Sequence, residues 1–331
     1  MSLPPTSNEL VGVIGAGSFG TTVANLLARN QSVLLYDRSA EKVATLSAEK
    51  RFKNWDMHPG IEYTDDLERL CRECRVIFPV IPSQYFRSLL ADLGPFLTPG
   101  HSLIHAIKGL DVSLPEGETL QSVGSLDRSQ VKTMSELIRS ETMVARVGCM
   151  AGPNLAGEIA DGMPAATVVA SPFDQVISEG KAVLRSPDFR VHASQDMLGI
   201  ELAGVLKNVM AIASGILGGL GYGDNTRALL ITRGLAEMAN IGTKLGADPR
   251  AFLGLAGIGD LVATCYSPRS RNYTVGYRLA KGESLDEIID SMEEVAEGVK
   301  TVCIVKALAS HYRTNNFVQA LAFGQSIANR I

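Results

Sequence analysis

The most informative stretch of the chain is VGVIGAGSFGTT, residues 11–22. An apolar run typical of a strand ends in Gly15-x-Gly17-x-x-Gly20, and a helix-like segment follows. Gly15 permits a tight turn, Gly17 lets the backbone approach a pyrophosphate, and Gly20 lets the helix pack closely on the strand. The pattern therefore predicts a dinucleotide-binding turn, with the amides at the start of the helix facing the phosphates.

The end of the second predicted strand carries Asp37 followed by Arg38. A carboxylate at this position binds the ribose 2′-hydroxyl and favours NAD, whereas an arginine accommodates a 2′-phosphate and favours NADP. Arg38 could equally be a solvated side chain at a strand end. The sequence therefore predicts NAD or NADP as cofactor and leaves the choice open.

Short β-branched runs alternate with helix-like segments through the first half of the chain. The runs are residues 10–14, 32–36, 75–81, 102–107, 143–148 and 165–170, and the segments between them include 18–29, 39–50 and 83–92. This alternation predicts a parallel sheet covered on both faces. Residues after about 195 instead show helical periodicity. We predict an α/β Rossmann-type dinucleotide-binding domain over residues 1–195, followed by an all-α helical substrate and catalytic domain over residues 196–331.

Composition excludes several classes of protein. The chain has 331 residues, 46% hydrophobic and 20% charged, as ordinary globular proteins do. Its net charge of -4 does not suggest a nucleic-acid or anionic-membrane surface. The N-terminus MSLPPTSNEL has neither the basic nor the apolar part of a secretory signal. The longest apolar run, 202–222, is interrupted by Lys207 and by glycines, so no integral membrane segment is expected.

The cysteine content is odd, with five residues. Without a secretory signal we expect reduced thiols in a cytoplasmic protein. Cys71 and Cys74 form a C-x-x-C, but there is no second pair and no nearby His cluster to complete a zinc site. We therefore expect no metal, and interpret the pair as two thiols one turn apart near a helix end.

One cation, Lys207, interrupts the apolar segment ELAGVLKNVMAIASGI, residues 201–216. A lysine in such a helix is costly unless it is paired or functional. Small residues share its helical face, which leaves room for a ligand: Ala203, Gly204, Ala211 and Ser214. The alternative is an aliphatic stem whose amine reaches water, and the helix alone leaves both interpretations open.

Other polar residues stand where a ligand could bind. Lys108 follows a predicted strand, and ligands of open α/β sheets lie at the carboxyl ends of strands. Asp260, in GIGDL, is either a site residue or an N-cap. Ser270-Arg271-Asn272 offers a guanidinium suited to phosphate oxygens, or is a polar loop between helices.

Together these motifs resemble the NAD(P)-dependent glycerol-3-phosphate dehydrogenases of the soluble bacterial type. The resemblance runs from Val11 to Ala328. It is carried by GAGSFGTTVA (15–24), PVIPS (79–83), KGL (108–110), GPNLAGEIA (152–160), ELAGVLKNVMAIASGI (201–216), GDLVATC (259–265), SRN (270–272) and AEGV (296–299).

The resemblance implies specific roles. Lys207 is implied as the proton acceptor, with Asp260 beside it in the catalytic site. The implied substrate contacts are Lys108, Gly152, Asn154, Lys207, Asp260, Ser270, Arg271 and Asn272. Besides the three glycines of the turn, the implied cofactor contacts are Ser18, Phe19, Arg38, Lys108, Ala156, Arg271, Val295 and Glu297. The family usually has a hydroxyl residue where Asn154 stands, although an amide can also donate to a substrate oxygen. Segment 111–130 is longer than expected and is interpreted as a surface loop.

The implied reaction is reversible hydride transfer between NAD(P)H and dihydroxyacetone phosphate, giving sn-glycerol 3-phosphate for phospholipid biosynthesis by a cytoplasmic homodimer. Lys207 can accept the hydroxyl proton if its pKa falls from about 10.4 towards roughly 7–8. Burial and Lys108 would lower that pKa, and Asp260 would raise it.

Two alternatives remain open. A 3-hydroxy acid dehydrogenase of the same two-domain plan would prefer a phosphate-free substrate. A non-catalytic dinucleotide sensor would bind NAD(H) without any substrate-dependent change in absorbance, and fold alone does not exclude it.

Overall fold

The computed structural model describes residues 10–114, 117–120 and 122–312. Its contacts group into two compact units. The sheet unit holds the described residues up to Ile107, Ser135–Met150 and Asn154–Met197, and the helical unit holds Lys108–Met134, Ala151–Pro153 and the described residues from Leu198 on. The domain boundary near residue 195 stays a prediction. Residues 1–9 and 313–331, which the predicted domains include, lie outside the described residues.

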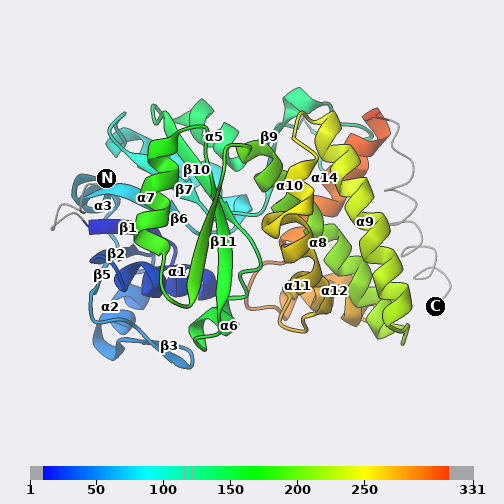
Figure 1. Ribbon diagram of the computed structural model, residues 1–331, viewed down its shortest axis with the longest axis horizontal. Helices are drawn as coiled ribbons and strands as arrows, with labels where there is room; N and C mark the ends of the chain where they lie inside the picture. Colours follow the sequence, from blue (N-terminus) through cyan, green and yellow to red (C-terminus); the bar gives the residue numbers. More distant parts are fainter. Residues whose placement is uncertain (1–9, 115–116, 121, 313–331) are drawn as a thin grey trace. The chain divides into compact units, whose positions relative to one another are not determined.

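The sheet unit is built on an eight-stranded sheet of order β12-β11-β10-β7-β6-β1-β2-β5 (Figure 1). The strands are β1 (Leu10–Ile14), β2 (Val33–Tyr36), β5 (Ile61–Thr64), β6 (Cys74–Pro79), β7 (Ser102–His105), β10 (Arg146–Ala151), β11 (Ala165–Ala170) and β12 (Phe189–Ser194). Pairing is parallel from β5 through β2, β1, β6 and β7 to β10, and again between β11 and β12. The chain leaves β1 first to one side and then to the other, so a topological switch point lies between β1 and β6.

Helices cover this sheet because its strands are apolar on both faces. They are α1 (Ser18–Ala28), α2 (Ala40–Glu49), α3 (Leu67–Glu73), α4 (Phe86–Leu93), α5 (Met134–Glu141), α6 (Ala156–Ala160) and α7 (Asp174–Leu184). Helix α1 contacts β1, β2 and β5, and α7 contacts β7, β11 and β12. A core of buried Val, Leu and Ile side chains from strands and helices holds the unit together.

The predicted parallel sheet is confirmed, with local differences. The run expected at 143–148 begins three residues later, at Arg146, because α5 occupies 134–141 and Thr142 closes its last turn on the Ile138 carbonyl. Strands β5 and β12 were missed in the sequence analysis. Each carries an exposed charged residue, Glu62 and Arg190, within a short run, which weakens the apolar signal.

The helical unit surrounds one long helix, α8 (Met197–Gly219). Its other helices are α9 (Asp224–Lys244), α10 (Arg250–Leu253), the π-helical turn η4 (Leu255–Gly259), α11 (Asp260–Tyr266), α12 (Arg271–Ala280), α13 (Leu285–Asp290) and α14 (Glu297–Tyr312). Helices α8 and α12 approach closely. A Cβ on Gly276 would lie 1.9 Å from the Ile212 carbonyl oxygen, and one on Gly215 would lie 2.0 Å from that of Tyr273. This contact sets the start of α12 beside α8.

Helix α8 is the one described helix that is long and apolar enough to cross a membrane by composition alone. However, 89% of its most apolar window is buried inside the protein. Leu202, Val205 and Leu206 belong to the core of the helical unit. Burial to this extent is typical of a helix in a protein core.

The expectation of a surface loop at 111–130 is wrong in part. Strands β8 (Leu110–Val112) and β9 (Val131–Thr133) form an antiparallel pair within the helical unit. Leu126 is fully buried in the core of that unit, and its amide donates to the Ala307 carbonyl. Residues 115, 116 and 121 lie outside the described residues. Short strands and isolated buried leucines give too little local periodicity to be recognised in sequence.

The interpretation of the C-x-x-C pair is confirmed. Cys71 lies in the last turn of α3 and Cys74 begins β6. Both are free and buried, and burial raises the pKa of each thiol to about 12. Such thiols are unreactive at neutral pH.

Candidate active site

The glycine-rich turn joins β1 to α1 at the switch point of the sheet. Gly15 has a φ of +108°, and a Cβ there would lie 2.5 Å from the Val80 carbonyl oxygen. A Cβ on Gly20 would lie 1.7 Å from the carbonyl oxygen of Gly15. Around Gly17, by contrast, nothing lies within 4 Å of an added Cβ. Gly17 is the N-cap of α1, so open space at its Cβ position adjoins the positive end of that helix, which fits a dinucleotide pyrophosphate.

Two glycine substitutions separate folding from cofactor binding. Gly20→Ala should destabilise the protein by about 1–3 kcal/mol or more, because the methyl group overlaps a backbone carbonyl. Gly17→Ala should unfold like the wild type but bind NADPH on the order of tenfold more weakly, because its methyl group occupies the approach of the pyrophosphate. Denaturant unfolding and NADPH fluorescence titration measure the two effects. Equal cofactor affinity for Gly17→Ala and wild type would contradict this account.

Asp37 lies directly after β2, and its carboxylate is held by the protein itself. It accepts from the Ala16 amide at 3.1 Å, the Ser39 amide at 3.1 Å and Lys42 Nζ at 3.1 Å. The Arg38 guanidinium lies 5.3 Å from the centre of the Tyr85 ring. Asp37 thus ties the end of β2 to the glycine turn, while Arg38 is stacked on an aromatic ring.

Asn154 and Ala156 lie at the start of α6. The Asn154 amide donates to the Ala166 carbonyl at 3.0 Å and accepts from the Thr167 hydroxyl at 2.9 Å. Both groups of this amide are therefore used to fasten the loop to β11. Ala156 begins α6, and its carbonyl accepts from Thr22 of α1 at 3.4 Å. A substrate contact by Asn154 stays a prediction, to be made through its remaining N–H.

In the helical unit, Asp260 bridges two lysines. Its Oδ1 lies 2.7 Å from Lys207 Nζ and its Oδ2 lies 2.6 Å from Lys108 Nζ. Lys207 comes from α8, Asp260 begins α11 directly after the π-helical turn, and Lys108 precedes β8. The side chains of Lys207 and Asp260 are 6% and 3% exposed, so both charges are buried. Breaking such a pair by removing one partner is strongly destabilising.

Both lysines keep donors for a ligand. Lys207 also donates to the Thr264 hydroxyl, which itself donates to the Asp260 carbonyl at 2.6 Å. Lys108 also donates to the Gly152 carbonyl at 3.2 Å. An ammonium has three N–H donors. Since each lysine has two partners among the described residues, a third donor on each is left for a substrate oxygen.

The three charges set the protonation of the site. Burial lowers the pKa of Lys207 to about 8, and the charge of Lys108 adds to this, while Asp260 acts in the opposite direction. Burial pushes the pKa of Asp260 upward, but Lys108 and Lys207 outweigh it and hold that pKa below its usual range. Lys207 can therefore give up and regain a proton close to neutral pH while Asp260 stays charged.

A chain of amides continues from this site to the start of α14. Asn208 donates to the Lys108 carbonyl at 3.4 Å and accepts from Asn272 Nδ2 at 2.9 Å. The Oδ1 of Asn272 accepts from the Gly298 amide at 2.9 Å. These bonds fix the orientation of both side-chain amides and connect Lys108 to the first turn of α14.

The N-terminus of α12 presents the Ser-Arg-Asn triplet. Ser270 is its N-cap, and the Ser270 hydroxyl accepts from the Tyr273 amide at 3.3 Å. Arg271 is 46% exposed; its Nη1 donates to the Val295 carbonyl at 2.9 Å and lies 3.2 Å from Glu294 Oε2. An exposed guanidinium at a helix N-terminus is suited to bind a phosphate. Glu297 begins α14 two residues after Val295.

Comparison with known proteins gives the family. Residues 10–177 match the model of the N-terminus of NAD-dependent glycerol-3-phosphate dehydrogenase, and residues 196–323 match the model of its C-terminus. The chain belongs to the NAD-dependent glycerol-3-phosphate dehydrogenase family. The resemblance inferred from the motifs is thereby confirmed.

Individual relatives agree with this assignment. The protein named glycerol-3-phosphate dehydrogenase (NAD(P)+) from Pseudomonas aeruginosa strain LESB58 is 44% identical over 306 residues, covering 91% of this chain and 85% of its own length. The one from Ectopseudomonas mendocina is 43% identical over 309 residues, covering 92% and 86%. A crystal structure of the enzyme from Coxiella burnetii superposes with a TM-score of 0.83 at 30% identity and 98% coverage of both chains. The yeast enzyme, at 23% identity and a TM-score of 0.80, shows the shared fold.

For this member of the dehydrogenase family, the structure excludes two of the alternative interpretations. Lys207 does not extend its amine to water, because the side chain is buried and the amine is bound to Asp260 and Thr264. Asp260 is not an N-cap, because it is the first residue of α11 and its oxygens accept from lysines. Burying either charged side chain alone would cost desolvation free energy, and the ion pair between Lys207 and Asp260 offsets that cost.

Two residues of this cluster were missed in the sequence analysis. Thr264 is one helical turn after Asp260, within GDLVATC, and Asn208 directly follows Lys207. The i, i+4 spacing could have indicated that Thr264 shares the face of Asp260. The pairing of Asn208 with Asn272 joins residues 64 apart and leaves no local signal.

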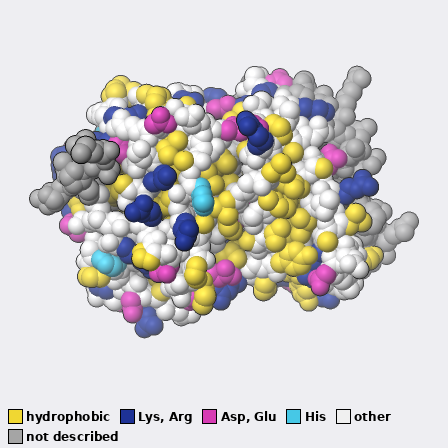
Figure 2. Space-filling view, viewed as in Figure 1, with side chains coloured by type: hydrophobic (Ala, Val, Ile, Leu, Met, Phe, Trp, Pro, Cys, Tyr) yellow, Lys and Arg dark blue, Asp and Glu magenta, His cyan; other side chains and the backbone are white. Residues whose placement is uncertain are grey.

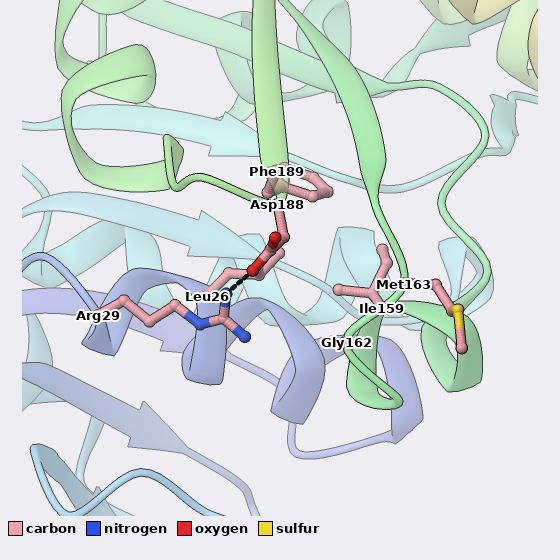
Figure 3. A pocket seen from close by; sticks show the side chains of 7 residues that line it. All are labelled: Leu26, Arg29, Ile159, Gly162, Met163, Asp188 and Phe189. Atoms are coloured by element: carbon pink, nitrogen blue, oxygen red, sulfur yellow. Dashed lines mark ion pairs between the residues drawn. The ribbon is translucent and has the colours of Figure 1, made fainter.

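Two further features concern metal binding and a hollow in the sheet unit. Among the described residues, no group of three His, Cys, Asp or Glu side chains could hold a metal ion. A hollow at the end of α1 is lined by Leu26, Arg29, Ile159, Gly162, Met163, Asp188 and Phe189 (Figure 3). Arg29 and Asp188 lie 3.8 Å apart across it. Its volume of about 10 Å³ has room for at most a single water molecule and is too small for a metabolite.

Proposed function

We propose that the chain is an NAD(P)-dependent dehydrogenase that interconverts dihydroxyacetone phosphate and sn-glycerol 3-phosphate. One observation carries this proposal: a lysine buried beside a carboxylate, with a pKa lowered to about 8 and one donor left for a substrate oxygen. Oxidation of a secondary alcohol needs a base of this strength, and reduction of a ketone needs its conjugate acid.

In the oxidative direction, Lys207 Nζ accepts the proton of the substrate hydroxyl. A nicotinamide cofactor held at the glycine turn would supply the hydride acceptor for the carbon that carries this hydroxyl. In the reductive direction, the Lys207 ammonium donates a hydrogen bond to the ketone oxygen and then supplies the proton. Asp260 remains charged throughout and stabilises the ammonium, and Thr264 holds the direction of the Nζ group.

Lys108 serves a second purpose beside Asp260. Burial is the main reason why the pKa of Lys207 is low, and the charge of Lys108 lowers that pKa further. The unused N–H of Lys108 can hold a second substrate oxygen while its stem is fixed by Asp260 and Gly152. Arg271, with Ser270 and Asn272, supplies the phosphate site at the start of α12. A phosphate anchored there positions the reacting carbon, which removes orientational entropy from the chemical step.

The residues at the end of β2 support a preference for NADP over NAD. All three donors around Asp37 come from the protein, which leaves its carboxylate less capacity for a ribose hydroxyl. Arg38 stacked on Tyr85, with Lys42 close by, offers cations for a 2′-phosphate. We therefore propose that the enzyme uses both cofactors and prefers NADPH.

The test is loss of absorbance at 340 nm with dihydroxyacetone phosphate in excess, using NADH and NADPH separately. We expect rapid oxidation of both cofactors. At low cofactor concentration, the rate should be higher with NADPH than with NADH. Binding of a cofactor without oxidation would overturn the proposal in favour of a sensor. A phosphate-free 3-hydroxy acid that outcompetes glycerol 3-phosphate in the reverse assay would favour the hydroxy acid dehydrogenase.

We further propose a cytoplasmic enzyme that supplies sn-glycerol 3-phosphate for phospholipid biosynthesis. All five cysteines are free thiols, which suits a reducing compartment. This role predicts that the reductive direction operates in the cell.

We also propose that the enzyme is a homodimer. Figure 2 shows hydrophobic side chains exposed over the helical unit. Leu229 of α9 is 59% exposed and Leu253 of α10 is 66% exposed, and apolar side chains gathered on a surface can form an interface between subunits. A molar mass of twice 35.3 kDa by light scattering would support the dimer, and the monomer mass would contradict it.

A further inference from the structure

Arg271 has an acidic partner within the protein, Glu294, in addition to the phosphate that is its proposed ligand. Glu294 Oε2 lies 3.2 Å from Arg271 Nη1, and the same nitrogen donates to the Val295 carbonyl at 2.9 Å. The carboxylate thus stands where an anionic ligand of Arg271 would compete for the guanidinium. A carboxylate and a phosphate offer the same kind of oxygen to the same fork of donors.

We propose that Glu294 is a determinant of phosphate affinity: its carboxylate lies against the Arg271 guanidinium, and the incoming phosphate must displace it or bind against its charge. This inference rests on the proposed function, which places a phosphate on Arg271. Glu294 is neither a proton donor nor a substrate contact. It acts through Arg271 by setting how much of the guanidinium's charge is already neutralised.

The charges decide the sign of the effect. The pair is partly exposed, with Arg271 46% and Glu294 30% accessible, so its attraction contributes little to holding the arginine in place. A phosphate monoester, however, carries nearly two negative charges above pH 7. The Glu294 carboxylate repels a phosphate that binds to the same guanidinium, and this repulsion opposes phosphate binding. Removing the charge of Glu294 should therefore strengthen phosphate binding.

The orientation of Arg271 does not depend on Glu294. Arg271 is the first residue of α12, whose N-cap is Ser270, and the Val295 carbonyl accepts from its side chain. The neighbouring segment is also fastened by the bond from the Gly298 amide to Asn272. If Glu294 served only to position Arg271, replacing Glu294 would weaken phosphate binding. The charge argument predicts the opposite result, so the two roles can be distinguished.

The test compares Glu294→Gln with Glu293→Gln, an exposed neighbour that removes the same charge from the same segment. For Glu294→Gln we expect the KM for dihydroxyacetone phosphate to fall about three- to tenfold at low ionic strength, beyond any change in the control, with kcat within about twofold. The difference should shrink as salt is added, because the pair is partly exposed. An unchanged or raised KM relative to the control would overturn the inference.

Two further measurements distinguish the substrate phosphate from the cofactor pyrophosphate, and a failure of this inference from a failure of the proposed function. The Kd for NADPH reports on the cofactor pyrophosphate; if it falls and the KM for dihydroxyacetone phosphate does not, the assignment of Glu294 to the substrate phosphate is overturned. Inorganic phosphate, titrated calorimetrically, reports on Arg271 without turnover. If the protein does not reduce dihydroxyacetone phosphate at all, the proposed function fails, and tighter phosphate binding by Glu294→Gln still supports the inference while equal binding overturns it.

Discussion

Replacing Lys207 by Met is expected to lower kcat on the order of 10²–10⁴-fold in both directions, the usual contribution of a positioned general acid or base. Met keeps most of the volume of the buried stem but has no proton to exchange. Cofactor binding should remain near the wild-type value, because Lys207 is not among the residues implied to contact the cofactor. Steady-state kinetics and NADPH titration measure the two quantities.

A matched control is Lys244→Met, which removes an exposed lysine from the last turn of α9. This variant should turn over like the wild type. Small primary amines in the buffer should partly restore the activity of Lys207→Ala, because the shortened side chain leaves room beside Asp260 for an external amine. Near-normal turnover of Lys207→Met would remove Lys207 from its proposed role.

Replacing Asp260 by Asn is expected to have the second largest effect. The substitution leaves two lysines close together without their shared carboxylate, and removing one partner of a buried ion pair costs about 3–5 kcal/mol. Asp260 raises the pKa of Lys207, so its loss should lower that pKa below about 8. The denaturation midpoint should fall, and the residual activity should shift its pH dependence towards lower pH.

Asp290→Asn, at the exposed end of α13, removes one carboxylate from the same unit and is the control for stability. It should change the midpoint little. A variant Asp260→Asn that is as stable as this control would show that the two lysines do not depend on Asp260. An unshifted pH dependence would show that Asp260 does not set the pKa of Lys207.

Local sequence predicts the fold well where a physical requirement is local. The glycines at 15, 17 and 20 are required by contacts within one turn, and the apolar strands β1, β6 and β11 are recognisable because both of their faces are buried. The strand pair around β8 and β9 is not recognisable in the same way. Its pairing joins residues 19 to 23 apart in sequence, and its apolar side chains complete a core made mostly by distant helices.

The candidate site divides in the same way. Lys207 and Asp260 each stand out as a charge in an apolar segment, so each could be singled out separately. That one carboxylate accepts from Lys207 and Lys108, which lie 53 and 152 residues away, depends on tertiary contacts alone. The same is true of Glu294, whose distance from Arg271 no spacing rule predicts.

The pH dependence of kcat/KM in both directions tests the role of Lys207 most directly. The oxidation of glycerol 3-phosphate needs the neutral amine, so its rate should rise as the pH increases through about 8. The reduction of dihydroxyacetone phosphate needs the ammonium, so its rate should fall through the same pH. Opposite limbs with a common midpoint near 8 are the predicted result; two profiles that are flat between pH 7 and about 9 would contradict the assignment.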